Sequence, residues 1–308
     1  MLIDAHTHIF PRIHGRIKSG PTRELAYGRV AIAENVIQAL PPIIESAHHT
    51  PEMLIASLDW ASVDRAILLQ GPFYGECNQY VCEAVQKYPD RLIGAAYFDP
   101  WEVGDKKEFE RIFSRSTFRT LKLEFSEATG LSGLHPQARL DDPEIAWLWD
   151  ELEARKIVLV IDMGEIGSRS YQTRELRTIA ESHLGLRIVI PHLAQPNPKA
   201  EAYSRLWKLW QEQIDLGRLP NVWFDTASLP AYAVGEDFPF PTAEKYLHMA
   251  LDRIGPNKVM WGTDIPALWI HATYKQLAKM AVLHVQHLSA SDQELVLARN
   301  AQQIFGVT

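Results

Sequence analysis

Two histidines separated by one residue stand at the end of the first apolar run of the chain. Residues 2–8 read LIDAHTH, a pattern typical of a buried β-strand. Because side chains alternate along a strand, His6 and His8 share one face and converge at the strand end. Imidazole is a ligand that Zn²⁺ binds readily, and Zn²⁺ needs three or four donors. The pair therefore predicts part of a divalent-metal site, with two solvated loop histidines as the alternative interpretation.

The elements that must position these histidines alternate regularly along the chain. Strands are predicted at residues 2–8, 64–70, 91–98, 118–125, 157–163, 186–192, 221–226 and 258–264. Helices are predicted at residues 50–60, 78–88, 105–113, 143–156, 173–183, 200–216, 242–254 and 272–287, with one more at 32–40 in a long excursion after strand one. Eight strand–helix units favour a (β/α)₈ TIM barrel, as one domain over residues 1–308 with an insertion after strand 1. An open doubly wound sheet is disfavoured, because no Gly-rich turn follows strand one.

In such a barrel, the polar residues that end apolar strands meet around one mouth. Those residues are His6, His8, Glu124, Asp162, His192, Asp225 and Asp264. Strand alternation predicts that Asp162 shares the inward face of Val160. It places His192 on the face of Ile190 in the same way. The alternative for any one of them is a helix cap, and this interpretation is strongest for Asp225.

The composition limits the partners. The 308 residues carry a formal charge of −7 and are 46% hydrophobic. A nucleic-acid binder or a protein for anionic membranes needs clustered basic residues, so a small molecule is the expected partner. Two cysteines, Cys77 and Cys82, are too few for a disulfide framework, and no apolar run reaches about 18 residues. We therefore expect a cytoplasmic protein without membrane or nucleic-acid partners, and the sequence leaves a homo-oligomer open.

Segments at five strand ends together resemble the amidohydrolase superfamily, in its amidohydrolase-related branch. They are IDAHTH at strand one, RTLKLEF at strand four, IVIPHLAQP at strand six, NVWFDTAS at strand seven and VMWGTDIP at strand eight. The stretches DRAILLQGPFYGECNQY, YPDRLIGAAYFDP and NAQQIFG are similar to the same branch, so the resemblance spans nearly the whole chain. The branch contains pyrone dicarboxylate lactonases and non-oxidative decarboxylases of the aminocarboxymuconate semialdehyde and resorcylate types. The resemblance implies a TIM barrel and a metal-dependent enzyme.

By position, the resemblance assigns His6 and His8 as metal ligands and His192 as the strand-six histidine. It assigns Asp264 as both a ligand and the general base. One position departs from the pattern, because the decarboxylases and typical metal-dependent members have a histidine at the end of strand five, where this chain has Asp162. Lactonase-like members often lack that histidine too, and some work without metal.

Oxygen ligands could replace the missing histidine. Asp162 or Glu124 would complete a set of imidazole and carboxylate donors that suits one divalent ion, with Zn²⁺ expected and Mn²⁺ as the alternative. A carbamylated Lys122 that bridges two metals and a metal-free mechanism are further alternatives.

The predicted activity is hydrolysis of a small lactone, ester or amide that carries a carboxylate. Asp264 would accept a proton from a water polarised by the ion, and His192 would orient or protonate the carbonyl oxygen. The candidates for gripping the substrate or forming the pocket wall are Arg119, Lys122, Arg12 and Tyr74. A non-oxidative decarboxylase of an aromatic or enoic acid is the first alternative, and a barrel that binds a ligand without turnover is the second. The negative charge at strand five favours hydrolysis, because it disfavours a substrate carboxylate held at the ion.

Overall fold

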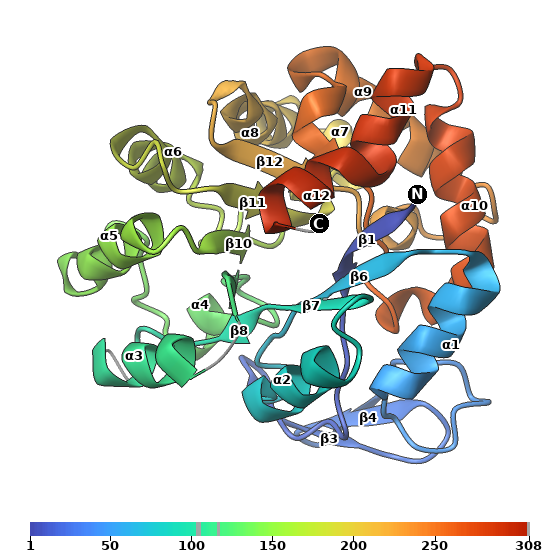
Figure 1. Ribbon diagram of the computed structural model, residues 1–308, viewed down its shortest axis with the longest axis horizontal. Coiled ribbons are helices and arrows are strands. Elements are labelled where there is room, and N and C mark those ends of the chain that lie inside the picture. Colours follow the sequence, from blue (N-terminus) through green and yellow to red (C-terminus); the bar gives the residue numbers. More distant parts are fainter. Residues whose placement is uncertain (103–105, 116–117, 307–308) are drawn as a thin grey trace.

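The computed structural model describes residues 1–102, 106–115 and 118–306, and it contains a ring of parallel strands surrounded by helices (Figure 1). In chain order, the strands of the ring are β1 (Ile3–Thr7), β6 (Arg65–Leu68), β7 (Leu92–Gly94), β8 (Ala96–Tyr97), β9 (Thr120–Glu124), β10 (Val158–Asp162), β11 (Ile188–Ile190), β12 (Val222–Asp225) and β13 (Val259–Met260). Parallel ladders run from β1 through β6 to β7, and from β8 in chain order to β13. Ala95 separates β7 from β8, and its N–H donates to the Leu68 carbonyl at 2.8 Å, so these two segments form one interrupted strand.

The ring is closed by hydrogen bonds between β1 and the residues that follow β13. Three backbone N–H groups cross this seam: Ala5 to the Trp261 carbonyl (3.0 Å), Asp264 to the His6 carbonyl (2.8 Å) and His8 to the Ile265 carbonyl (2.9 Å). If β7 and β8 are counted as one strand, the described residues form eight parallel strands around one axis. The predicted (β/α)₈ TIM barrel is confirmed.

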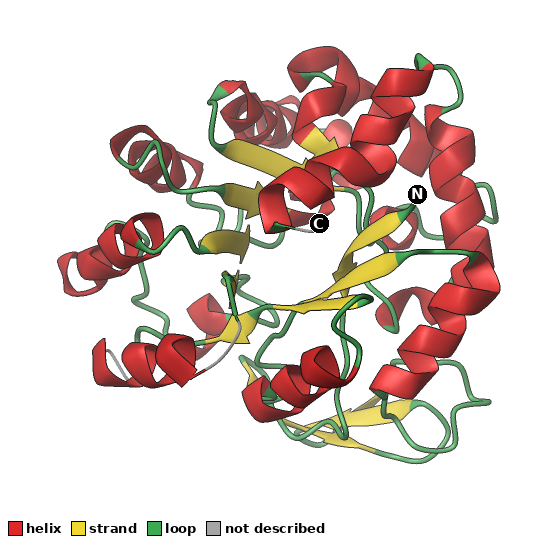
Figure 2. Cartoon of the chain, in the orientation of Figure 1, coloured by secondary structure: helices red, strands yellow, loops and turns green. Residues whose placement is uncertain are grey.

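Helices follow the strands and cover the outside of the ring (Figure 2). The outer helices are α1 (Pro51–Ala61), α2 (Asn78–Lys87), α3 (Lys106–Arg115), α5 (Ala146–Ala154), α6 (Thr173–Ser182), α8 (Ser204–Ile214), α9 (Pro241–Ile254) and α10 (Tyr274–Val285). Shorter helices are α4 (Leu131–Leu134), α7 (Pro198–Glu201), α11 (Ala290–Glu294) and α12 (Asn300–Phe305). Each outer helix overlaps a predicted one, and Asp105, the predicted start of the third helix, lies outside the described residues. Local signals explain two starts: Thr50 caps α1 by accepting from the Met53 N–H at 3.2 Å, and α10 begins with a capping box of Thr273 and Gln276.

Apolar side chains fill the inside of the ring. This inner cluster contains Ile3, Ala5, Ile67, Leu69, Ala95, Val158, Val160, Val189 and Met260. Helix α12 covers the end of the barrel where the strands begin, and its Ile304 and Phe305 join the inner cluster. The opposite end, where the strands stop, is therefore the end left for a pocket.

The insertion after strand one differs from the prediction. Residues 32–40, predicted as a helix, contain instead the end of β4, a turn and β5, within an antiparallel sheet of β2 (Arg16–Ile17), β3 (Gly20–Glu24), β4 (Arg29–Ile32) and β5 (Asn35–Gln38). The apolar residues of this stretch recur at helical spacing, but Ala33 takes a left-handed conformation with φ 50° and turns the chain back, so that Ile32 pairs with Asn35. The two ends of the insertion are joined, because Phe10 and His49 exchange backbone hydrogen bonds of 2.9 and 3.0 Å.

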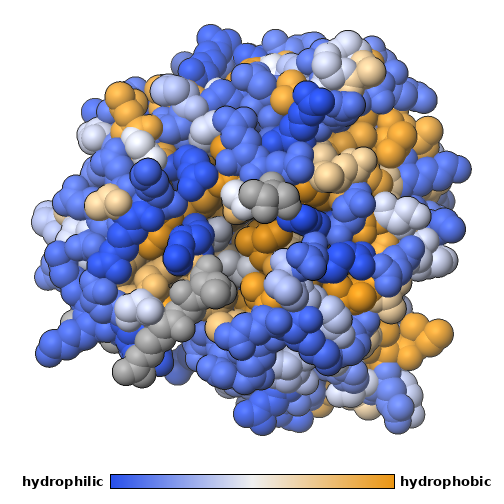
Figure 3. Space-filling model, in the orientation of Figure 1, coloured by the Kyte–Doolittle hydropathy of each residue, from blue (hydrophilic) through white to orange (hydrophobic). Residues whose placement is uncertain are grey.

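The surface on the side of the molecule that Figure 3 shows is mainly hydrophilic, with smaller apolar areas between the charged side chains. Within the described ranges, no helix combines the length and the apolar character that crossing a bilayer requires.

A buried carboxylate holds the seam together. Asp4 is fully buried and accepts four hydrogen bonds: from Thr263 Oγ1 (2.6 Å), the Thr263 N–H (2.9 Å), the Tyr274 hydroxyl (3.0 Å) and the His6 N–H (3.1 Å). Burial raises the pKa of Asp4 to about 7, although these hydrogen bonds lower it. One side chain thus ties β1 to the segment after β13 and to α10.

Replacing Asp4 with Ala should lower the free energy of unfolding by about 3 kcal/mol or more, because each buried donor left without an acceptor costs about 1–3 kcal/mol. Urea denaturation of the purified protein measures this. The matched control is Asp64→Ala, which removes an exposed carboxylate that accepts from the Leu2 N–H (2.7 Å), just before β1. The control should change stability by less than about 1 kcal/mol. Equal losses in the two variants would contradict the role given to Asp4.

Candidate active site

An irregularity in β1 turns the two histidines toward the inside of the barrel. Ile3 and Ala5 belong to the inner cluster, and simple alternation would send His6 outward. The pairing of β1 with β6 shifts, however, because Asp4 lies opposite Ala66 and Thr7 lies opposite Leu68, so β1 has one extra residue. After this bulge, His6 and His8 both face the pocket.

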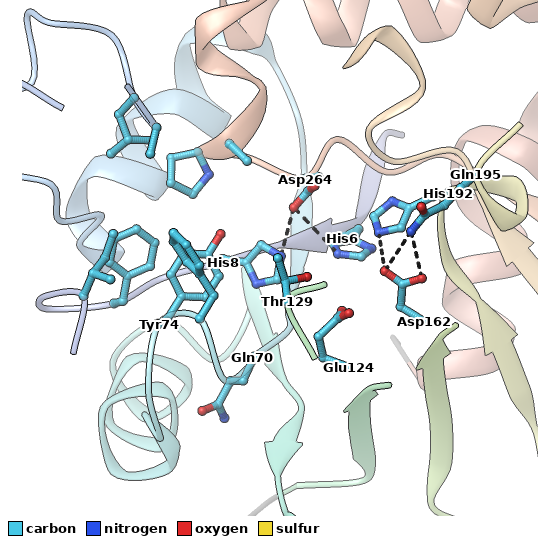
Figure 4. A pocket seen from close by; sticks show the side chains of 18 of the residues that line it. His6, His8, Gln70, Tyr74, Glu124, Thr129, Asp162, His192, Gln195 and Asp264 are labelled. Atoms are coloured by element: carbon cyan, nitrogen blue, oxygen red, sulfur yellow. Dashed lines mark hydrogen bonds and ion pairs between the residues drawn. The ribbon is translucent and has the colours of Figure 1, made fainter. Parts of the chain in front are cut away.

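The pocket is a cavity of about 300 Å³ at the end of the barrel where the strands stop (Figure 4). It is lined by His6, His8, Phe10, Ile13, Ala39, Leu40, Gln70, Gly71, Phe73, Tyr74, Glu124, Thr129, Asp162, His192, Gln195, Tyr232, Asp264, Pro266 and Ala267. The structure therefore brings together the six residues predicted as ligands or catalytic groups, and Tyr74 with them. The insertion contributes Phe10, Ile13, Ala39 and Leu40 to the same pocket.

The three histidines of the pocket are held by hydrogen bonds at Nδ1. His6 Nδ1 lies 3.0 Å from Asp225 Oδ2, His8 Nδ1 2.9 Å from the Leu69 carbonyl and His192 Nδ1 3.0 Å from the Ala227 carbonyl. Because a carbonyl oxygen only accepts, Nδ1 of His8 and of His192 must carry hydrogen, and the carboxylate of Asp225 selects the same form of His6. The Nε2 atoms of His6 and His8 face Asp264 in the pocket, whereas Nε2 of His192 faces Asp162. Burial lowers the pKa of His6 well below its usual value, so this ring is neutral and can donate a lone pair.

Asp264 lies against the two histidines of strand one. Its Oδ1 is 3.0 Å from His8 Nε2 and 3.9 Å from His6 Nε2, and the Ser228 hydroxyl donates to Oδ2. The residue takes a left-handed conformation with φ 69°, which aspartate tolerates better than most residues. Burial raises the pKa of Asp264, but its contact with His8 and the charges of the nearby histidines lower this pKa by more than burial raises it. The carboxylate is therefore ionised.

His192 is paired with Asp162 on the other side of the pocket (Figure 4). His192 Nε2 lies 3.4 Å from Asp162 Oδ2, and the Gln195 amide donates to the same carboxylate at 3.1 Å. Burial alone would lower the pKa of His192, but Asp162 and the other nearby carboxylates raise it to about 9. The strand-five aspartate thus contacts the strand-six histidine, whereas the potential ligand atoms of His6, His8 and Asp264 lie within 4.8 Å of one another.

The backbone before His192 departs from the predicted alternation. Val189 belongs to the inner cluster, whereas Ile188 and Ile190 pack outside the barrel, so the predicted shared face of Ile190 and His192 is wrong. His192 reaches the pocket because residues 192–195 are all left-handed, with φ between 45° and 61°. Such a conformation costs roughly 1–2 kcal/mol per residue. Hydrogen bonds from the Trp210 indole to the Leu193 carbonyl (2.8 Å) and from the His192 N–H to Asp225 (2.9 Å) hold it in place.

Lys122 and Glu124 form an ion pair deeper in the barrel, with Nζ 3.2 Å from Oε2. Lys122 is 1% exposed and does not line the cavity, whereas Glu124 does. Burial lowers the pKa of Lys122, but Glu124, Asp162 and Asp225 raise it by more, so the lysine remains a cation. Lys122 therefore serves as a counter-charge beneath the pocket instead of meeting a substrate carboxylate.

The two predicted arginines do not reach the pocket. Arg119 precedes β9, at the end of the barrel opposite to the cavity, and its guanidinium donates to the Phe118 carbonyl at 2.7 Å. Arg12 is exposed on the insertion. This corrects their assignment as substrate-binding residues: Arg119 lies at the start of a parallel strand, and Arg12 lies between two pocket residues but faces outward. No lysine or arginine of the described residues lines the cavity.

Sequence reasoning left the role of some contributors open and missed others. Asp225 is predicted at the mouth of the barrel, with a helix cap as the alternative; it is fully buried and contacts His6 Nδ1, with Trp223 before it on the same inward face. That alternation was the available signal for its role. Gln195 and Ser228 each have a left-handed backbone conformation, so no strand pattern predicts where their side chains point.

The fold and the converging histidines and carboxylates are those of a TIM-barrel enzyme. The chain belongs to the amidohydrolase family, whose model matches residues 3–307. Among solved structures, an amidohydrolase from Burkholderia multivorans with bound Zn aligns with a TM-score of 0.74 and 17% identity over 100% of both chains. A probable 2-pyrone-4,6-dicarboxylic acid hydrolase from Acinetobacter baumannii with bound citric acid aligns with a TM-score of 0.68 and 18% identity over 99% of both chains.

A third structure, 2,6-dihydroxybenzoate decarboxylase complexed with 2,6-dihydroxybenzoate, aligns with a TM-score of 0.58 and 15% identity over 83% of this chain and 88% of that chain. No curated protein shows significant sequence similarity to the chain.

Replacing Asp225 with Ala should weaken binding of a divalent ion by roughly 10- to 100-fold, because His6 loses the acceptor that fixes its ring. Competition with a chromogenic chelator, using Zn²⁺ and Co²⁺, measures the affinity. The matched control is Asp99→Ala, which removes another buried carboxylate that follows a strand but contacts His135 outside the cavity. The control should leave the affinity unchanged, and an unchanged affinity in Asp225→Ala would contradict the role of the acceptor.

Proposed function

We propose that this protein is a hydrolase of a small lactone or ester and that it binds one divalent ion at His6, His8 and Asp264. One observation carries the proposal. His8 Nε2 and Asp264 Oδ1 are only 3.0 Å apart, although His8 Nδ1 already donates to a carbonyl. Two acceptor atoms at this distance require a proton or a cation between them, and His6 Nε2 points to the same place.

The donor set fits a catalytic metal site. Two imidazole nitrogens and one carboxylate oxygen are ligands that Zn²⁺ takes, and Mn²⁺ is the alternative. Three protein ligands leave a position open for a reactant, as catalytic zinc sites do. Zn bound to the Burkholderia multivorans amidohydrolase supports the same choice. A divalent ion held here would act as a Lewis acid toward a carbonyl group or a water molecule.

The side chains of the chain supply an acid and a base on opposite sides of the pocket. Asp264 is ionised, so it can accept a proton from the water that attacks the substrate carbonyl. His192 is protonated and can hydrogen-bond the carbonyl oxygen and give a proton to the departing alkoxide. Asp162 and its partner Gln195 hold the imidazolium in place. Water then adds across the acyl–oxygen bond, which yields a hydroxy acid or an acid and an alcohol.

Decarboxylation is the alternative reaction, because one of the similar structures is a decarboxylase bound to an aromatic acid. Two features of this pocket favour hydrolysis. A substrate carboxylate bound at the proposed ion would lie beside Asp264, Asp162 and Glu124, which already balance the charge of that ion, so its binding there gains less. In addition, no lysine or arginine among the described residues lines the pocket, so no further positive charge is available to a substrate carboxylate.

The purified protein should contain about one divalent ion per chain, and His8→Ala should lower this content several-fold, because an open site with only two protein ligands holds the ion weakly. Elemental analysis after dialysis against metal-free buffer measures the content. His135→Ala is the control, because His135 pairs with Asp99 outside the cavity and should not change the content. Wild-type protein that binds no ion after loading would remove the metal from the proposal.

Asp264→Asn should lower kcat for lactone hydrolysis by roughly 10²- to 10⁴-fold with a smaller change in KM, because a general base is lost while the side-chain shape is kept. A panel of lactones and esters and a panel of aromatic and enoic acids should be assayed side by side. Metal content is measured in parallel, so that loss of the ion is not mistaken for loss of the base. Release of carbon dioxide from an acid, without hydrolysis of any acyl substrate, would establish the decarboxylase instead.

A further inference from the structure

We propose that the pocket takes an uncharged acyl compound with an apolar substituent, and that this substituent lies against the insertion of residues 10–49, which contains β2 to β5. The inference rests on the proposed function for the acyl group that reacts. It replaces the carboxylated substrate expected from the sequence, and it assigns the insertion as the element that selects the substrate.

The charges around the cavity argue against an anionic substrate. Asp264, Asp162 and Glu124 line the pocket, no lysine or arginine is among its described lining residues, and His192 is already paired with Asp162. Lys122 is paired with Glu124 and does not line the cavity. A carboxylate on the distal part of a substrate would therefore lose its water without gaining a cationic partner, which is strongly unfavourable.

The insertion builds an apolar wall opposite the histidines. Phe10, Ile13 and Leu40 are 0%, 1% and 3% exposed, so their side chains are held in fixed positions by the packing around them. The ring of Phe10 stacks on Tyr74 with centroids 4.4 Å apart and planes 13° from parallel. Tyr74 in turn contacts the His8 ring at 5.0 Å. A continuous apolar surface thus leads from the predicted ligands to the insertion.

Apart from the acid and the base, the cavity also has neutral polar lining residues. Gln70 is not available, because its amide donates to Asn78 and to the Ala95 carbonyl and accepts from the Cys77 N–H. Tyr74 and Tyr232 line the cavity. A phenol hydroxyl suits a carbonyl or ring oxygen, and it needs no charge on the ligand. A cavity of about 300 Å³ is at the small end of ligand pockets, which restricts the substituent to a short chain or one ring.

Two matched pairs of compounds test the proposal with the metal-loaded protein. One pair is δ-decalactone and the same ring with a side chain of equal length that ends in a carboxylate. The other pair is the corresponding cyclic ketones, which cannot be hydrolysed. The uncharged lactone should have a kcat/KM at least about ten-fold higher, and the uncharged ketone should bind at least about ten-fold more tightly by calorimetry, because the terminal carboxylate would be desolvated without a partner.

A charge introduced on the insertion should change this preference. Ala39→Arg places a guanidinium at a half-buried position that lines the cavity, and the ratio of carboxylate-ended to uncharged ketone binding should rise by about ten-fold or more. The control, Ile43→Arg, adds the same charge to the insertion at a residue that is 88% exposed and outside the cavity, so the ratio should stay at the wild-type value. Thermal unfolding of both variants checks that they fold.

The ketones separate this proposal from the proposed function. The expected ranking of the ketones without hydrolysis of any lactone would uphold the ligand class and reject the proposed hydrolysis. Equal or tighter binding of the carboxylate-ended ketone to wild-type protein, or no binding of either ketone, would overturn the proposal. An unchanged ratio in a folded Ala39→Arg variant would overturn the role of the insertion.

Discussion

The seam between β1 and the segment after β13 is the constraint on which the site depends. His6 and Asp264 come from opposite ends of the chain, and the hydrogen bond from the Asp264 N–H to the His6 carbonyl exists only when the barrel closes. Gly262 permits this close approach, because a Cβ at that position would lie 3.0 Å from the His6 Cβ. Asp4 then joins both sides through buried hydrogen bonds. Assembly of the predicted metal ligands is therefore inseparable from completion of the fold.

The balance of charge inside the barrel supports the proposed binding of a cation. The carboxylates of Glu124, Asp162, Asp225 and Asp264 face one protonated histidine, His192, and one lysine, Lys122. The formal sum is four negative charges and two positive ones, or −2, which one divalent ion neutralises. Burial also raises the pKa of Glu124 and of Asp225, as expected for carboxylates in a low-dielectric site with too little positive charge nearby. The metal set and the His192–Asp162 pair thus complement one another.

The sequence was sufficient for the elements that obey simple periodicity. The strands are buried and apolar on both faces, so their runs were recognisable, and alternation placed Asp162 and Glu124 correctly relative to Val160 and Lys122. It failed where tertiary contacts select a rare backbone conformation. The bulge in β1 and the left-handed residues 192–195 reverse which side chains face inward, and neither has a local signal in residue type. The helix predicted in the insertion was wrong for a related reason, because the turn at Ala33 forms although the apolar residues have helical spacing.

The division between the barrel and the insertion separates the reaction from the choice of substrate. The histidines and carboxylates stand at strand ends, where the ring fixes their spacing, whereas the apolar wall comes from the insertion, from residues before and after its antiparallel sheet. Proteins that share the barrel at 15–18% identity include a probable hydrolase and a decarboxylase, so the frame alone does not select a reaction. In this chain, the selecting features are local. Asp162 makes strand five anionic and pairs with His192, and the insertion offers apolar contacts where an anionic substrate would need a cation. Because these features lie on different elements, a change in the insertion can alter which acyl compound binds without moving the groups that transfer protons.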